Sequence, residues 1–495
     1  MVEWRTRYGW GLALVAGGLL RLLFFYSLRP PVTGDSLIYG TLARNLVAHH
    51  LYGYSGTPLQ PTLIRLPGYP LFLSVGYSLS GNAFGGLALW VQMALDLTGC
   101  ALLGVLAERL TFGLKGDEAE SGRVSARVGL AAVWLAALCP FTANYAAALM
   151  PESLSVFCVV LALFGLERWN TGWRNGAGGP GAASRVWTVV IGCSLAGAVL
   201  LRPDQGLLAA AVLPAMLWTG WQTWARKGTR FIRCIEPAAL AGLLFLLPLL
   251  AWSARNWRVF HAIQPLAPRY AQELNETPPV GFYRWYRSWA IEYKSNLDIY
   301  WRYDDDPIHL GDLPARAMDN LQQRRQTQAV FDRYNEIQSA TPELDAEFAR
   351  IADERIADDP LRYYLVLPVA RELDMWLRPR LEFAPIPVDW WVFSRHPWPS
   401  AEAAAYALLN AGYLMLALAG LLRWRRIRWN GREVLAFAML GFVVLRCALL
   451  LTLDNSEPRY TLECLPVVMV LGAMSLVPRT IAAPGIRADT PGGSS

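Results

Sequence analysis

Long apolar runs recur along this chain. Each is about 17 to 22 residues long, enough for a helix to cross a hydrocarbon core roughly 30 Å thick. The chain is 54% hydrophobic and 17% charged, which excludes an ordinary soluble domain. We therefore predict an all-α polytopic membrane protein with about ten transmembrane helices. The runs lie near residues 10–28, 87–107, 128–149, 153–168, 186–201, 206–222, 236–254, 402–422, 433–453 and 459–477.

The amino-terminal segment MVEWRTRYGW continues directly into the first apolar run. It lacks the small-residue cleavage site of a secretory signal peptide. We therefore expect an uncleaved first membrane helix.

Basic residues in the short connectors predict the orientation in the membrane. Short loops rich in Lys and Arg stay in the cytoplasm, so both termini are predicted to be cytoplasmic. The stretch 256–400 has more acidic than basic residues and is predicted to lie outside, with the connector 454–460. The basic residues thus indicate topology and not nucleic-acid binding. They are Arg5 and Arg7; Arg168, Arg174 and Arg185; Arg226, Lys227, Arg230 and Arg233; and Arg423, Arg425, Arg426, Arg428 and Arg432.

These signals divide the chain into four parts. We expect a membrane module over 1–255 with outer loops at 29–86 and 150–152, a mainly helical outer region over 256–400, transmembrane helices over 401–478, and a disordered tail over 479–495. In the outer region, residues 260–312 are rich in Trp, Tyr and Arg, and residues 314–378 have a helical pattern. Thr341 and Asp359 precede prolines and are predicted helix caps.

The short apolar segment 67–79 contains prolines and tyrosines, which suit the membrane interface. If it crossed the membrane, Asp35 and Glu152 would face opposite sides. We predict a juxtamembrane segment on the outer face, which leaves ten crossings and brings both acids to that face.

Cysteine usage excludes two common frameworks. The seven cysteines fall in or beside apolar runs, none lies in the large outer region, and no CxxC spacing occurs. We therefore expect neither a disulfide framework nor a zinc site. No internal repeat, P-loop or dinucleotide fingerprint is present.

Two acidic residues are candidates for chemistry. Asp35 follows the first apolar run, and a carboxylate at the bilayer surface costs free energy unless it is hydrated, paired or bound to a cation. The alternative for Asp35 is an ordinary loop residue. Glu152 lies in MPES at a predicted helix start, where it could instead simply oppose the helix dipole.

Arginines at outer helix ends are candidate ligands for a phosphate, because the planar guanidinium suits phosphate recognition. The alternative for each is an interfacial arginine that reaches toward the headgroups. Arg202 can also pair locally with Asp204. The candidates are Arg65, Arg202, Arg255 with its neighbour Asn256, and Arg459 with its neighbour Tyr460.

Asp96 and Arg446 lie inside apolar runs, where a charge needs a partner. We predict that they pair with each other in a structural role.

Six segments stand out in this order along the chain: GDSLIYGTLARNL, RLPGYPLFL, CPFTANYAAALMPESLSV, LLRPDQGLL, WSARNWRVF and EPRYTLECLP. Together they resemble the GT-C membrane glycosyltransferases, most of all the bacterial relatives of the protein O-mannosyltransferases and of the lipid A aminoarabinose transferase. The chain departs from the family in having one acidic residue, not a pair, at the key position of the first loop, and in an outer region that is helical and small. The resemblance implies a GT-C-like helical bundle with a juxtamembrane helix, to which the helical pattern of the outer region adds a helical periplasmic loop.

The resemblance implies transfer of a sugar, hexosyl or pentosyl, from a polyprenyl-phosphate donor to a lipid, glycan or protein acceptor. The enzyme would work with inversion at the periplasmic face of a bacterial inner membrane. Asp35 would be the general base, and Glu152 would complete a divalent-cation site (Mg²⁺ or Mn²⁺) with Asp35 or steer the acceptor. The alternatives are a transporter or flippase of lipid-linked glycan, and a glycan polymerase or ligase. The sequence favours the transferase over the transporter because its candidate charges gather at one face and no internal repeat occurs. A polymerase or ligase would differ by transferring whole oligosaccharides.

Overall fold

A computed structural model describes residues 2–27, 32, 34–81, 86–112, 118–175, 182–228, 230–274, 276–384, 386–424 and 433–477. The predicted tail 479–495 and the basic connector residues Arg425, Arg426, Arg428 and Arg432 lie outside the described residues. Within these ranges the chain is helical, with no β-strand and one isolated bridge between Gly53 and Pro61. The predicted all-α membrane architecture is confirmed.

Seven helices are long and apolar enough to cross a membrane: α1 (Val2–Ser27), α4 (Leu87–Thr111), α7 (Glu152–Asn175), α8 (Ala182–Leu201), α10 (Phe231–Phe260), α16 (Pro397–Trp424) and α17 (Glu433–Leu450). An eighth span results if α5 (Glu118–Ala137) and α6 (Pro140–Ala146), which meet at an angle of 55°, form one broken crossing. Pro140 begins α6 and has no N–H with which to continue the α5 ladder.

Besides the bent pair α5 and α6, two more of the ten predicted crossings differ from simple spans. The run 206–222 forms α9 (Gly206–Lys227), whose apolar residues are interrupted by Pro214 and mixed with Thr219 and Gln222. The run 459–477 forms a 3₁₀ segment, η6 (Pro458–Cys464), followed by the 10-residue helix α18 (Leu465–Met474). The residues of α18 are all buried in the bundle, which explains why this run is strongly apolar although its α-helix is short.

The outer region is folded around its own aromatic core. Its elements are α11 (Val280–Arg287), α12 (Tyr293–Ser295), the π-helix η2 (Asn296–Tyr300), the 3₁₀ turns η3 (Leu310–Asp312) and η4 (Ala315–Ala317), α13 (Leu321–Ile337), α14 (Pro342–Asp358), the π-helix η5 (Arg362–Val366) and α15 (Leu367–Leu377). Phe282, Trp285 and Phe348 are buried together there. Thr341 accepts a hydrogen bond from Leu344 N at 3.3 Å and so caps α14, as predicted. Asp359 likewise accepts from Arg362 N at 2.9 Å.

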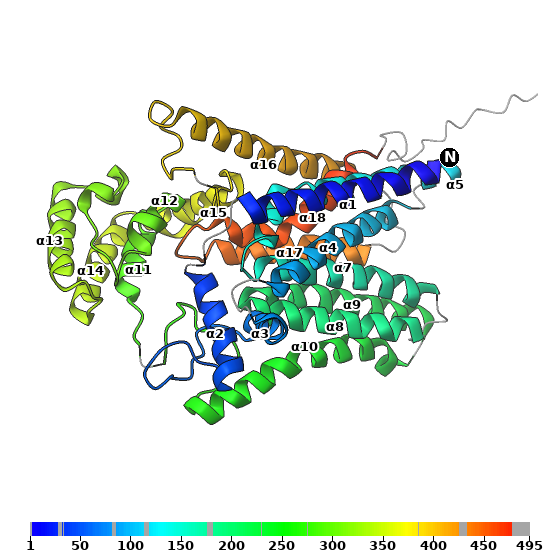
Figure 1. Cartoon of the computed structure of the whole chain (residues 1–495), viewed down its shortest axis with the longest axis horizontal. Coiled ribbons are helices and arrows are strands. Elements are labelled where there is room, and N and C mark those ends of the chain that lie inside the picture. Colours follow the sequence, from blue (N-terminus) through cyan, green and yellow to red (C-terminus); the bar gives the residue numbers. More distant parts are fainter. Residues whose placement is uncertain are drawn as a thin grey trace, which may run out of the picture.

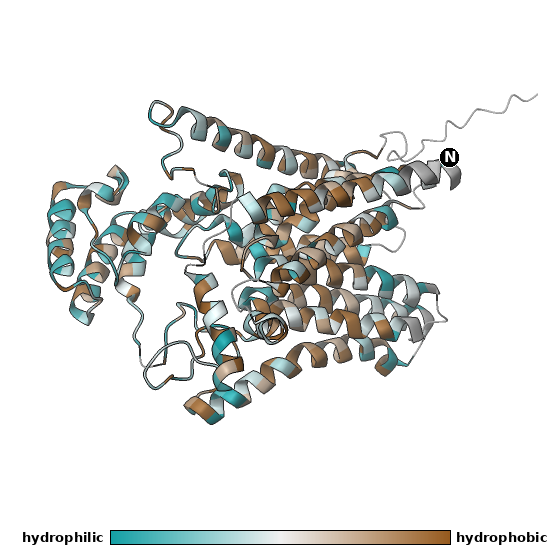
Figure 2. Ribbon diagram, in the orientation of Figure 1, coloured by the Kyte–Doolittle hydropathy of each residue, from teal (hydrophilic) through white to brown (hydrophobic). Residues whose placement is uncertain are grey.

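The two ends of the bundle differ. The amino terminus lies at one end, and helices α11, α13 and α14 lie beyond the other (Figure 1). The long helices are mainly hydrophobic along their middle, whereas α13 and α14 carry many hydrophilic residues (Figure 2). Helices α2 (Asp35–His49) and α3 (Gly68–Ser80) lie at the end that faces the outer region.

Helix α3 lies across the direction of the spans. Figure 1 shows it nearly end-on, whereas the long helices run across the view. Its 13 residues cover only about 20 Å at 1.5 Å per residue, less than the hydrocarbon core. Helix α3 thus has the length and direction expected of the predicted juxtamembrane helix.

A close approach of α3 to the end of α8 depends on Gly68. A Cβ atom at this position would lie 2.6 Å from the carbonyl carbon and oxygen of Leu200. Any other side chain would therefore push α3 away from the last turn of α8, next to Arg202.

Candidate active site

Four segments that are distant in sequence meet at one place, at the end of the bundle that faces the outer region. Asp35 begins α2, Glu152 begins α7, Arg202 follows the last residue of α8, and η6 carries Arg459. Arg459 Nη1 lies 2.8 Å from Asp35 Oδ2 and 3.6 Å from Glu152 Oε1. The two acids therefore share a guanidinium, as their predicted position on one face requires.

Asp35 is held by two arginines, one on each carboxylate oxygen. Arg65 Nη2 donates to Oδ1 at 2.6 Å, and Arg459 Nη1 donates to Oδ2 at 2.8 Å. Burial raises the pKa of Asp35, but the charges of Arg459 and Arg65 outweigh burial and hold this pKa well below its usual range. Asp35 is therefore ionised at neutral pH and is a weak base in this arrangement.

Glu152 is more deeply buried, with 1% of its side chain exposed. Arg202 Nη1 donates to its Oε1 at 2.7 Å. The second oxygen, Oε2, is buried without a hydrogen-bond partner among the described residues. A buried carboxylate oxygen in this state can accept a hydrogen bond from a substrate at little desolvation cost.

The ion pairs continue from Arg202 into the bundle. Arg202 Nε lies 3.3 Å from Asp204 Oδ1, the local pair that the sequence predicted, and 3.2 Å from Glu463 Oε1. Arg446 lies 2.6 Å from Asp204 and 2.8 Å from Glu463. The chain of ion pairs thus joins the end of α8, α17 and η6.

The ring of Tyr460 packs under two of these guanidiniums. The Cζ atoms of Arg202 and Arg459 lie 5.5 Å and 5.8 Å from its centroid. Glu457 also pairs with Arg459, and burial raises the pKa of Glu457. Each guanidinium of the cluster contacts at least one carboxylate, so an incoming anion competes with a carboxylate for it. We call this group the ion-pair cluster; it consists of Asp35, Arg65, Glu152, Arg202, Asp204, Arg446, Glu457, Arg459 and Glu463.

Arg255 and Asn256 belong to a different group of contacts, at the end of α10. Arg255 donates to the carbonyl oxygens of Thr62 and Tyr52 at 2.9 and 3.2 Å and lies over the Trp252 ring. Asn256 donates to Gln264 O at 2.7 Å. Arg255 thus holds the first outer loop against α10, and Asn256 holds the segment that follows α10, so both residues have a structural use.

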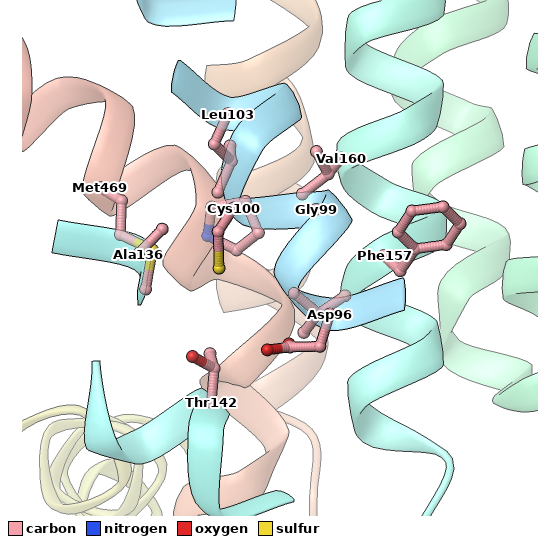
Figure 3. A pocket seen from close by; sticks show the side chains of 11 residues that line it. Asp96, Gly99, Cys100, Leu103, Ala136, Thr142, Phe157, Val160 and Met469 are labelled. Atoms are coloured by element: carbon pink, nitrogen blue, oxygen red, sulfur yellow. The ribbon is translucent and has the colours of Figure 1, made fainter. Parts of the chain in front are cut away.

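Asp96 and Arg446 do not pair with each other, which corrects the prediction from the apolar runs. Arg21 of α1 donates from Nε to Asp96 Oδ2 at 2.6 Å, and Arg446 joins the ion-pair cluster. Asp96 borders a cavity of about 10 Å³ inside the bundle, with Thr142 and Cys100 nearby (Figure 3). That volume suits about one water molecule, so this pair has a structural role.

The predicted metal ligands Asp35 and Glu152 do not fit a resident divalent cation. Both oxygens of Asp35 and one of Glu152 accept from arginines, and Arg459 lies between the two carboxylates. Among the described residues, no group of three or more His, Cys, Asp or Glu side chains is arranged to hold a metal ion. The positive charge between the carboxylates therefore comes from a guanidinium.

Sequence reasoning did not identify Glu457, Glu463 or the contribution of Arg446 to this site. Glu463 is fully buried, and it lies in the apolar stretch LECLPVVMV. A charged residue inside an apolar run indicates a buried partner, and this signal applies to Glu463 as it does to Asp96 and Arg446.

The sequence matches no protein-family model and no curated protein. In fold, the chain is similar to ArnT from Cupriavidus metallidurans bound to undecaprenyl phosphate, with a TM-score of 0.40 and 15% identity over 94% of this chain and 77% of that one. It is also similar to the oligosaccharyltransferase AglB from Archaeoglobus fulgidus in complex with an inhibitory peptide and a dolichol-phosphate, with a TM-score of 0.49 and 10% identity. That match covers 95% of this chain and 50% of AglB, so the chain spans about half the length of AglB. The likeness concerns the fold alone.

Proposed function

We propose that this protein is an integral membrane glycosyltransferase that moves one sugar from a polyprenyl-phosphate donor to a hydroxyl of a lipid, glycan or protein acceptor. The observation that carries the proposal is the shared guanidinium of Arg459, which joins Asp35 and Glu152 at the end of the bundle that faces the outer region. This position combines carboxylates for proton transfer with arginines for an anionic lipid headgroup.

The donor phosphate would bind by exchange. Arg65 and Arg459 are engaged by Asp35, and a phosphate that takes over these two guanidiniums would release the carboxylate. Loss of both cationic partners raises the pKa of Asp35, because the charges of Arg459 and Arg65 are what lower it. The donor itself would thus convert Asp35 from a weak base into a stronger one.

The released carboxylate of Asp35 would accept the proton of the acceptor hydroxyl. The acceptor oxygen forms a bond to the anomeric carbon, the bond from that carbon to the phosphate oxygen breaks, and its electron pair stays on the phosphate. Arg65 and Arg459 stabilise the charge that develops on the leaving phosphate. A single displacement of this kind inverts the anomeric configuration. Either a hexosyl or a pentosyl donor fits this scheme.

The basic connectors support an orientation with both termini in the cytoplasm and the reaction at the outer face. From the family resemblance, we propose that this is the periplasmic face of a bacterial inner membrane. Arg459 supplies the positive charge between the carboxylates, so the proposal includes no step through a metal ion.

The test is transfer from a panel of radiolabelled polyprenyl-phosphate sugars by purified protein in lipid nanodiscs, with membrane extract as acceptor. We expect the wild type to consume one donor and Asp35→Asn to consume it far more slowly. Donor movement in proteoliposomes without covalent turnover would indicate a flippase, and products longer by whole oligosaccharides would indicate a polymerase or ligase. Full activity of Asp35→Asn would refute the role of Asp35.

A further inference from the structure

A cavity of about 160 Å³ lies between the outer region and η6. A single water needs roughly 10–15 Å³ on this scale, so the cavity has room for one small ring-shaped ligand. Its walls come from three segments outside the membrane spans. These are the α12–η2 segment, the connector between α15 and α16, and Pro458; the walls include Tyr293, Leu297, Arg378, Glu382 and Trp390.

Glu382 supplies an unsatisfied polar atom in this wall. Its Oε1 atom is buried and has no hydrogen-bond partner among the described residues. Such an atom in a natural protein calls for an explanation, and a ligand is one of the few available. Burial also raises the pKa of Glu382, although Arg380 opposes the shift, so the carboxyl retains its proton more readily than an exposed glutamate.

The connector that carries Glu382 is fixed to the segment that carries Arg459. Arg380 Nη1 donates to Pro458 O at 2.8 Å, and Arg380 also bonds the Thr461 hydroxyl. Its side chain is buried in this contact and joins the wall of the cavity to η6.

The cavity adjoins the ion-pair cluster through Pro458. This residue lines the cavity, and it lies in the chain between Glu457 and Arg459, which both belong to the cluster. Tyr293 forms another part of the wall, and the charges of Glu457 and Glu382 add to the effect of burial in raising its pKa. Next to Glu382, the ring of Phe383 packs against Tyr145 with centroids 4.9 Å apart.

We infer that this cavity binds a neutral sugar ring of the acceptor, with Glu382 bonding its hydroxyl groups. The inference rests on the proposed function and specifies the acceptor side of the same site. The aromatic and aliphatic walls from Tyr293, Trp390 and Leu297 suit the apolar faces of a sugar ring, and few polar groups converge there.

The chemistry of Glu382 favours a neutral ligand over a cation. A carboxyl group accepts hydrogen bonds from a sugar hydroxyl in either protonation state, and it also donates one when it carries a proton. The neighbouring Arg378 and Arg380 oppose a cationic ligand at this position. The location favours the acceptor over the donor, because the lipid tail of the donor lies among the spans and none of the lining residues belongs to a span.

Binding is measured with the full chain in lipid nanodiscs and a panel of methyl pyranosides and methyl pentosides, by saturation-transfer NMR. We expect at least one glycoside to bind saturably and Glu382→Gln to weaken it about tenfold, the effect of losing roughly 1.4 kcal/mol of hydrogen bonding. Ala384→Phe, which fills the cavity, should abolish binding. Glu354→Gln makes the same chemical change on the surface of α14 and should leave binding unchanged.

Ala384→Phe keeps the test decisive if Glu382→Gln fails to fold. The inference is wrong if no glycoside binds, or if Ala384→Phe binds the glycoside as the wild type does. Where transfer is active, both variants should raise the KM for acceptor and leave the Kd for donor unchanged. Because glycoside binding needs no turnover, binding without transfer would refute the proposed function alone, and transfer without cavity binding would refute this inference alone.

Discussion

Asp35→Asn is expected to separate donor binding from catalysis. Asp35 accepts two charge-assisted hydrogen bonds, from Arg65 at 2.6 Å and from Arg459 at 2.8 Å. Asparagine keeps the shape of the side chain but not its charge, so both arginines become more available to a phosphate. The variant should therefore bind the donor more tightly and turn it over more slowly.

The magnitude follows from the strength of these two bonds. Each carboxylate oxygen of Asp35 accepts from one arginine, whereas asparagine keeps one acceptor oxygen and presents an NH2 group to the other arginine. Loss of one hydrogen bond to a charged group weakens the competition by about 1.5–3 kcal/mol. The Asp35 side chain is 23% exposed, and solvent screening reduces this gain. We expect a net gain near 1.4 kcal/mol, or about tenfold in the Kd for donor. Loss of the general base should lower kcat by about 10² to 10⁴.

The assay measures donor Kd by tryptophan fluorescence in nanodiscs and kcat by single-turnover transfer with the same donor. Asp353→Asn makes the same change at an exposed ion pair on α14 and should alter neither quantity. Weaker donor binding by Asp35→Asn would refute the exchange of arginines from carboxylate to phosphate. An unchanged kcat would refute the general-base role.

Three further predictions concern the same cluster. Arg446→Met removes the cation that pairs with Asp204 and with the fully buried Glu463, and it should lower the unfolding free energy by about 3–5 kcal/mol. Thermal unfolding in detergent measures this loss. A loss below about 1 kcal/mol would contradict a buried ion pair. Chelation with EDTA should leave transfer within about twofold, because Arg459 replaces a cation between the carboxylates, and a loss restored by Mg²⁺ would overturn this. The pKa of Asp35 is lowered in the folded state, so the stability that the ionised carboxylate contributes is fully present above its unfolded pKa of about 3.9 and is lost as the pH falls below that value toward the folded pKa. The difference in unfolding free energy between wild type and Asp35→Asn should therefore be constant from about pH 8 to 5 and shrink below about pH 4. A difference that grows in acid would show that the pKa shift has the opposite sign.

The sequence by itself determined the fold class and the end of the bundle at which the site lies. Apolar length determines spans, because only a helix of about 20 residues satisfies its backbone across the hydrocarbon core. Segment 67–79 is too short to cross the hydrocarbon core. Without a crossing there, Asp35 and Glu152 are predicted to lie at the same end of the bundle, where Arg459 contacts both. The cap at Thr341 could be predicted from the sequence because a capping residue lies next to its helix in the chain.

Only the tertiary structure decided which charges meet. Asp96 pairs with Arg21 and not with Arg446, because helix packing and not sequence distance selects the partner of a buried charge. In the sequence, Arg255 and Arg459 look alike, because each is an arginine at a predicted outer helix end. In the structure, Arg255 holds a loop, whereas Arg459 contacts two acidic residues. The burial of Glu382 Oε1 without a hydrogen-bond partner among the described residues also depends on the packing of segments far apart in the chain. Periodicity and length are local properties of the chain, whereas the pairing of charges depends on contacts between segments whose separation only the folded protein defines.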